Sequence, residues 1–147
     1  MASALSRLGR HVPCPAHGGK DGFRLFRDTD ETGGGIRLFA PGPVIGVAEG
    51  METALAVRMR TGMPVWSAAS ASLLARLEPP PETSLVVVWA DRDRSGAGEE
   101  AAMTLRERLQ RQGISVAMHL PPGPIPARAK GIDWADVWCN RTERAVA

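Results

Sequence analysis

Two short apolar segments, each followed by an acidic residue, place the strongest constraint on the fold of this chain. Residues 44–48 read Val-Ile-Gly-Val-Ala and precede Glu49, and residues 84–90, which include the run Leu-Val-Val-Val-Trp, precede Asp91. Short, nearly continuous apolar runs are typical of strands that are buried on both faces of a parallel sheet. Such strands need helices to cover them, so helical segments should alternate with them along the chain.

The segments around these two runs have the expected alternation. Helices are predicted over residues 51–60, 70–77, 99–112 and 132–140, and further strands over residues 64–68 and 114–120. We expect three arginines of the third helix to face solvent: Arg106, Arg108 and Arg111. The pattern predicts an α/β, Rossmann-like fold with a mainly parallel sheet of about four strands and helices on both faces.

The N-terminal part of the chain has a different pattern. Apolar and basic residues alternate over residues 22–27 and again over residues 36–39, with a charged and then glycine-rich segment between them. A period of two is typical of strands. The sequence therefore predicts an N-terminal β-hairpin in front of the α/β part.

Acidic residues follow both apolar runs. Glu49 ends the first, Asp91 ends the second, and Asp93 comes two residues later. The carboxyl ends of parallel strands share one edge of a sheet, and ligands bind there. Carboxylates held close together repel each other, and a bound Mg²⁺ or Mn²⁺ is the usual remedy. The alternative is that Glu49 and Asp91 only cap the helices that follow them.

Other residues near these acids could add to such a site. Gly50 and Gly96 leave the backbone accessible at predicted helix N-termini, where a phosphate can approach the N–H groups. Asp133 could be a further ligand. It could equally be a helix N-cap that forms a reciprocal capping arrangement with Asp136.

Three stretches that contain these residues resemble the Toprim domain of plasmid- and phage-borne DNA primases. They are Val47 to Ala54, Asp91-Arg92-Asp93 and Lys130 to Asp133, and the resemblance extends over about residues 36–140. It implies the Toprim fold, with Glu49, Asp91 and Asp93 as catalytic residues and as ligands of Mg²⁺ or Mn²⁺ together with Asp133. It divides the chain at residue 35, with the Toprim domain over residues 36–147.

Residues 1–35 are similar to a shortened zinc ribbon of the kind that opens such primases. Cys14 and His17 stand where the family has its first pair of metal ligands, and no second pair follows. A structural zinc site needs four ligands, so we expect no stable zinc site here. We interpret this segment as a remnant of the ribbon.

The resemblance also implies an activity, namely Mg²⁺-dependent primer synthesis from nucleotides on a single-stranded DNA template. A helicase or another replication or transfer protein would be a partner. Side chains expected to contact phosphates or nucleic acid are Lys20, Arg24, Arg92, Arg94 and Lys130. No apolar run reaches the roughly 20 residues of a membrane span, and we expect a cytoplasmic protein without membrane contact.

Two alternatives to primer synthesis remain open. A nuclease could use the same carboxylates, with water in place of the attacking hydroxyl. A non-catalytic module that docks on DNA or on a replication complex would also explain why no segment corresponds to the template-binding part of the primases. The formal net charge of +2 and the aromatic content of 5% provide no extended nucleic-acid surface.

Overall fold

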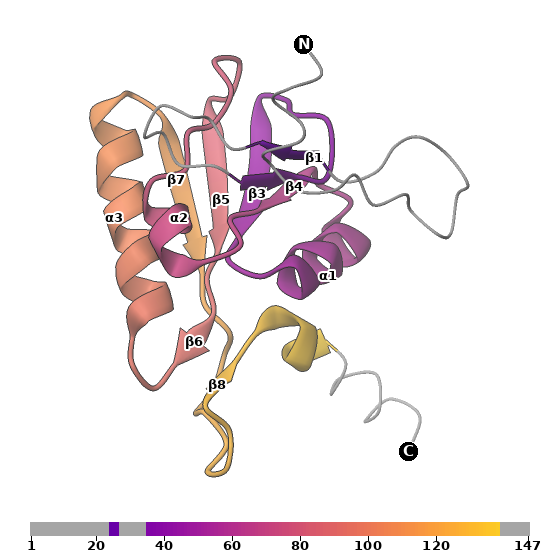
Figure 1. Cartoon of the computed structure of the whole chain (residues 1–147), viewed down its shortest axis with the longest axis vertical. Coiled ribbons are helices and arrows are strands. Elements are labelled where there is room, and N and C mark those ends of the chain that lie inside the picture. Colours follow the sequence, from indigo (N-terminus) through magenta and orange to yellow (C-terminus); the bar gives the residue numbers. More distant parts are fainter. Residues whose placement is uncertain (1–23, 27–34, 139–147) are drawn as a thin grey trace.

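A computed structural model of the chain describes residues 24–26 and 35–138, with only the backbone described for residues 24–26 (Figure 1). Its main feature is a six-stranded sheet in the order β1-β2-β4-β3-β5-β7. The strands are β1 (Arg24–Phe26), β2 (Gly35–Arg37), β3 (Val44–Ala48), β4 (Val65–Ser67), β5 (Leu85–Trp89) and β7 (Ser115–His119). A second, two-stranded sheet is formed by β6 (Arg92–Asp93) and β8 (Gly131–Ile132).

Helices cover both faces of the six-stranded sheet, as the sequence predicts. They are α1 (Met51–Thr61), α2 (Ala71–Ala75), α3 (Ala97–Arg111) and a last helical segment at residues 134–138. In the described part of the chain, none of these helices has the length and apolarity that crossing a membrane would require. The predicted α/β class and Rossmann-like arrangement are confirmed.

Strands β4, β3, β5 and β7 are mutually parallel and form the predicted four-stranded core of the sheet. In their register Ala48 lies beside Trp89, and Trp89 lies beside His119. Because parallel strands end at the same edge, the segments after β3 and β5 leave the sheet side by side. This edge carries β6 and β8 and lies at the bottom of Figure 1.

The predicted N-terminal hairpin is present and belongs to the same sheet. Strand β1 pairs antiparallel with β2, with Arg24 opposite Arg37, and β2 pairs antiparallel with β4. The turn between β1 and β2 lies outside the described residues. The proposed division at residue 35 falls on the first residue of β2, and that division remains a prediction.

Two apolar cores lie on opposite faces of the sheet. Along β5, Val86 and Val88 pack with α2 and α3, whereas Val87 and Trp89 pack with α1 and the segment at residues 134–138. This alternation follows from the two-residue period of a strand. Each fully buried aliphatic side chain contributes about 1.5–3 kcal/mol to folding, so the uninterrupted run in β5 stabilises both layers.

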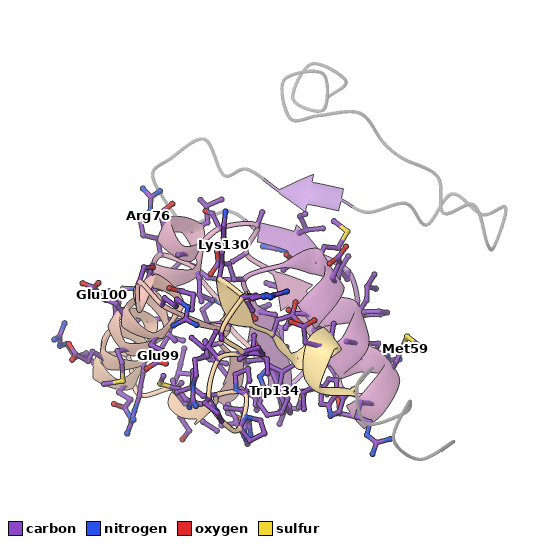
Figure 2. All side chains as sticks on the ribbon, turned by 90° about the horizontal axis from the view of Figure 1, so that it is seen from below. Met59, Arg76, Glu99, Glu100, Lys130 and Trp134 are labelled. Carbon is purple, nitrogen blue, oxygen red and sulfur yellow. The ribbon has the colours of Figure 1, made fainter. Side chains whose placement is uncertain are left out.

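Helix α3 covers its face of the sheet in the predicted way. Ala102, Leu105 and Leu109 are all fully buried. Glu99 and Glu100 lie in its first turn (Figure 2), where their charge interacts favourably with the helix dipole.

The prediction that all three arginines of α3 face solvent is wrong for Arg108. Arg106 and Arg111 are exposed, but Arg108 is half-buried and donates hydrogen bonds to Leu77 O and to the Glu78 carboxylate. Helix α2 ends shortly before these residues, and carbonyls beyond a helix end need donors. Arg108 supplies them and joins α2 to α3.

Gly46 is needed where β3 packs against β4. A Cβ atom at this position would collide with Val65 Cγ2 and lie 3.0 Å from Met63 Sδ. We expect Gly46→Ala to lower the free energy of unfolding by about 1–3 kcal/mol because the core there would be overpacked. Urea denaturation of the full chain checks this.

The matched control is Gly42→Ala, because a Cβ atom at Gly42 would have no atom within 4 Å. We expect this variant to stay within about 0.5 kcal/mol of the wild type. Equal effects of the two substitutions would contradict the packing argument.

Candidate functional site

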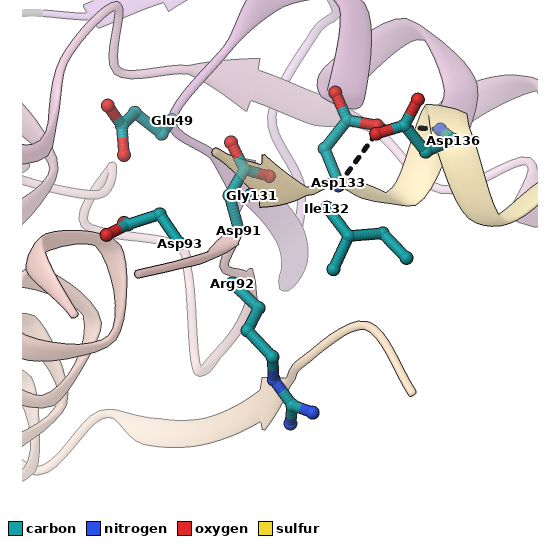
Figure 3. A pocket seen from close by; sticks show the side chains of 8 residues that line it. All are labelled: Glu49, Asp91, Arg92, Asp93, Gly131, Ile132, Asp133 and Asp136. Carbon is teal, nitrogen blue, oxygen red and sulfur yellow. Dashed lines mark hydrogen bonds between the residues drawn. The ribbon is translucent and has the colours of Figure 1, made fainter. Parts of the chain in front are cut away.

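An open pocket of about 340 Å³ lies at the edge of the sheet where β3 and β5 end (Figure 3). Its lining comes from three separate segments: the residue after β3, the turn after β5, and β8 with the start of the last helix. The lining residues are Glu49, Asp91, Arg92, Asp93, Gly131, Ile132, Asp133 and Asp136. The structure therefore brings all four predicted carboxylate ligands to one pocket.

The backbone at Glu49 is held by the neighbouring strand. The carbonyl of Glu49 accepts a hydrogen bond from Ala69 N at 2.8 Å and another from Ser67 Oγ at 3.0 Å. These bonds continue the pairing of β3 with β4 by one residue. They fix the point from which the Glu49 side chain reaches the pocket.

Asp91 is held by the first turn of α1, the helix that follows Glu49. The hydroxyl of Thr53, the third residue of α1, donates to Asp91 Oδ1 at 3.2 Å, and Thr53 is only 1% exposed. Thr53 was not among the residues predicted for the site. The available signal was a hydroxyl residue in the first turn of the helix that follows Glu49.

The pKa of Asp91 is raised from 3.8 to about 6. The largest cause is its removal from water, followed by the negative charge of Asp133, while the Thr53 hydrogen bond acts in the opposite direction. The carboxylates of Glu49 and Asp93 raise the pKa further. The raised pKa thus reports that negative charge from all three segments converges on Asp91.

Asp93 is in a different environment. Its carboxylate accepts hydrogen bonds from Ser95 N at 2.7 Å, Gly96 N at 2.8 Å and Gly98 N at 3.2 Å, and also from Ser95 Oγ. These bonds, with that from Ser95 Oγ the largest cause, lower the pKa of Asp93. The Asp93 side chain thus binds the start of α3, toward which it points in Figure 3. Glu49 and Asp91 do not cap the helices that follow them, because the N-caps of α1 and α3 are Gly50 and Gly96 and neither helix has a side-chain cap bond.

The bond from Gly96 N bears on a predicted phosphate contact. Because this N–H already donates to Asp93, a phosphate at Gly96 would have to displace the carboxylate. Position 98 requires glycine for a packing reason, because a Cβ atom there would lie 2.9 Å from Asp91 O. The close start of α3 against the Asp91–Asp93 turn depends on it.

Asp133 reaches the pocket because β8 pairs with β6, which places Gly131 opposite Asp93. The predicted reciprocal cap is confirmed: Asp136 N donates to Asp133 Oδ1 at 2.7 Å, and Asp133 N donates to Asp136 Oδ2 at 3.3 Å (dashed in Figure 3). The two interpretations of Asp133 are compatible. The residue caps the last helix and lines the pocket.

Arg92 is the basic residue in the lining of the pocket, and its guanidinium is engaged elsewhere. Arg92 donates to Gly123 O at 2.8 Å and lies 3.7 Å from Glu99, and its guanidinium points away from the carboxylates (Figure 3). Among the residues that the structure describes, no arginine or lysine forms a salt bridge with the carboxylates of the pocket.

The carboxylates form an acidic pocket and not a closed metal cluster. Within the described part of the chain, no three Asp, Glu, His or Cys side chains lie close enough together to hold a metal ion as they stand. Their chemistry nevertheless fits a hard divalent cation, because they are oxygen donors with uncompensated charge and Asp91 has a raised pKa.

The remaining predicted residues have varied positions. Gly50 is the N-cap of α1, and Lys130 follows the loop after β7, where its carbonyl accepts a bond from Arg94 N. Cys14, His17 and Lys20 lie outside the described residues, and for Arg24 only the backbone is described. Their zinc and phosphate roles remain predictions.

We expect Asp91→Asn to stabilise the protein near neutral pH, because the substitution removes a charge that burial and three neighbouring carboxylates disfavour. The pKa of Asp91 is about 6 in the folded chain, compared with 3.8 for an unperturbed aspartate. Folding therefore takes up a proton between these values, and the wild type loses stability as the pH rises through this window. Thermal unfolding at a series of pH values measures the difference in Tm.

The gain in Tm should be largest above about pH 6 and shrink toward about pH 4. Glu82→Gln, which removes an exposed carboxylate before β5, is the control and should give no such pH dependence. A gain for Asp91→Asn that is the same at every pH would contradict the assignment of the raised pKa.

Comparison with known protein families identifies two segments. Residues 44–143 match the Toprim domain, and residues 9–36 match the zinc-binding domain of primase-helicase. No curated protein and no solved structure matches the chain. The Toprim match spans more than half of the chain and includes every residue that lines the pocket. The chain belongs to the Toprim domain family, and its Toprim domain follows a segment similar to a primase-type zinc ribbon.

Proposed function

We propose that this protein acts on nucleic acid as a DNA primase-type nucleotidyltransferase that depends on Mg²⁺ or Mn²⁺. The observation that carries the proposal is the acidic pocket at the edge of the parallel strands, where the pKa of Asp91 is about 6 and no basic side chain of the described residues balances the charge. The Toprim match over this pocket and the primase-type segment in front of it support the primase class.

The residues of the pocket would have distinct roles. Asp91 and Asp133 would hold the cation, with Glu49 either as a further ligand or as the base that accepts the proton of the attacking 3′-hydroxyl. When bound, Mg²⁺ would neutralise charge on the nucleotide triphosphate and align the reacting oxygens. Asp93 would contribute through Oδ2, because Oδ1 already accepts three hydrogen bonds and Oδ2 accepts one.

The proposed substrates are ribonucleotides and a single-stranded DNA template, and a helicase or another replication protein is the proposed partner. Lys20, Arg24 and Lys130 are proposed to contact phosphates, together with the backbone at Gly50. Arg92 could do so only after leaving Gly123 O and Glu99. Zinc is not part of the proposal, because Cys14 and His17 supply only two ligands.

The test is templated ribonucleotide incorporation by the full chain on single-stranded DNA with Mg²⁺. We expect Asp91→Asn to lower incorporation by more than about a hundredfold. Loss of a residue that supports a metal ligand already lowers activity by up to about a hundredfold, and loss of a direct ligand should lower it at least as much. Glu82→Gln, which removes an exposed carboxylate at the other end of β5, should retain wild-type activity. Equal activity of the wild type and Asp91→Asn would refute the catalytic role.

The wild type and Asp91→Asn also distinguish a primase from a nuclease and from a non-catalytic module. Nicking of plasmid DNA in Mn²⁺ without nucleotides, lost in Asp91→Asn, would assign a nuclease in place of a primase. Binding of DNA that persists in EDTA, without incorporation or nicking, would assign a non-catalytic module.

Metal affinity should also depend on pH. A cation binds the ionised carboxylate, so protonation of Asp91, whose pKa is about 6, competes with binding. One such group predicts about fourfold weaker Mn²⁺ binding at about pH 5.5 than at about pH 7.5. Titration calorimetry of the wild type measures this, and an affinity that stays constant over that range would contradict it.

A further inference from the structure

Both arginines of the Asp-Arg-Asp-Arg sequence at residues 91–94 donate hydrogen bonds to carbonyls of the loop that follows β7. The Arg94 side chain donates to three carbonyls: Nη2 lies 3.0 Å from Pro126 O and 3.5 Å from Ala127 O, and Nε lies 3.1 Å from Ala129 O. The Arg94 backbone N–H donates to Lys130 O at 3.1 Å. Arg92 adds a bond to Gly123 O at 2.8 Å.

The loop needs these bonds because it has little else to hold it. Residues 120–130 connect β7 to β8 and contain no helix or strand, and residues 122–124, 126–128 and 130 are exposed. At its end, β8 pairs with β6 at two positions only, Arg92 with Ile132 and Asp93 with Gly131. Segments with few buried contacts open easily, so the guanidinium bonds are the main anchors before β8.

This loop leads through β8 directly to Asp133. Asp133 comes directly after β8, and it is the neighbour that most strongly raises the pKa of Asp91 after the effect of burial. A shift of residues 126–131 would therefore move the Asp133 carboxylate relative to Asp91. The loop connects the Arg94 side chain, which lies outside the pocket, to a carboxylate inside it.

We propose that Arg94 is a positioning residue whose guanidinium fixes residues 126–130 against the Asp91–Asp93 turn and thereby holds Asp133 at the pocket. The anchoring of the loop stands on the contacts alone, whereas the consequence for metal binding rests on the proposed function. A different role, direct contact of Arg94 with a substrate phosphate, would require a positive charge but not this set of carbonyl bonds.

Lysine distinguishes the two roles. A guanidinium presents several donors in a fixed planar fork, whereas an ammonium is a single point charge. Arg94→Lys keeps the charge and cannot reach carbonyls spread over residues 126–129 at once. Arg94→Gln removes the charge as well. Arg106→Gln, at an exposed position of α3, is the control for loss of one positive charge.

The first measurement is hydrogen exchange of the metal-free full chain. We expect the amides of residues 127–132 to exchange about tenfold faster in Arg94→Lys and Arg94→Gln than in the wild type. The amides of β5 should be unchanged, which shows that the variants are folded, and Arg106→Gln should match the wild type throughout. Wild-type exchange of residues 127–132 in Arg94→Lys would overturn the proposal.

The second measurement is Mn²⁺ affinity. We expect Arg94→Gln to weaken Mn²⁺ binding about tenfold, as the loss of a residue that supports a metal ligand does. Loss of a positive charge near an acidic pocket would by itself strengthen cation binding, so a weakening cannot come from the charge alone. Asp133→Asn should weaken binding too. Unchanged or tighter binding in Arg94→Gln would overturn the positioning role. A wild type that binds no Mn²⁺ would refute the proposed function, and the exchange measurement would still decide the anchoring.

Discussion

The parallel pairing of β3 with β5 is the constraint on which the rest of the site depends. In this register Ala48 lies beside Trp89, so the chain leaves both strands at the same edge and carries Glu49 and Asp91 with it. Burial first, and then repulsion by the neighbouring carboxylates, raise the pKa of Asp91 in this pocket. Gly46 protects this arrangement, because its missing side chain lets β4 close against β3.

The two aspartates of the turn after β5 show how environment divides one short motif into two roles. Asp91 is removed from water and has acidic neighbours, whereas Asp93 receives four hydrogen bonds, three of them from backbone N–H groups at the start of α3. Their pKa values consequently move in opposite directions. Asp93 ties α3 to the turn, whereas Asp91 is the carboxylate of this motif that burial and its neighbours disfavour in the charged form.

The alternation of apolar runs and helix formers was sufficient to predict the parallel core and the convergence of Glu49, Asp91 and Asp93, because both follow from strand periodicity and strand ends. The reciprocal cap of Asp133 and Asp136 was also predictable, since it depends on residues three positions apart. The hydroxyl of Thr53 and the guanidinium of Arg94 were not. Their partners lie more than thirty residues away, and no local pattern specifies such a contact. The predicted solvent exposure of Arg108 was wrong for the same reason, because its partners Leu77 and Glu78 are also distant in the sequence.

An excess of like charge in a folded pocket is unfavourable, and the structure limits this cost at three of the carboxylates in different ways. Thr53 donates to Asp91, the first turn of α3 donates to Asp93, and Asp136 N donates to Asp133. Each donor stabilises one carboxylate without adding a full positive charge, and Arg92 and Arg94 are occupied by loop carbonyls. Neutral donors lower the repulsion, yet the net charge of the pocket remains available to a cation. A guanidinium directed at the carboxylates would have relieved the repulsion more completely and would have reduced the attraction for a cation.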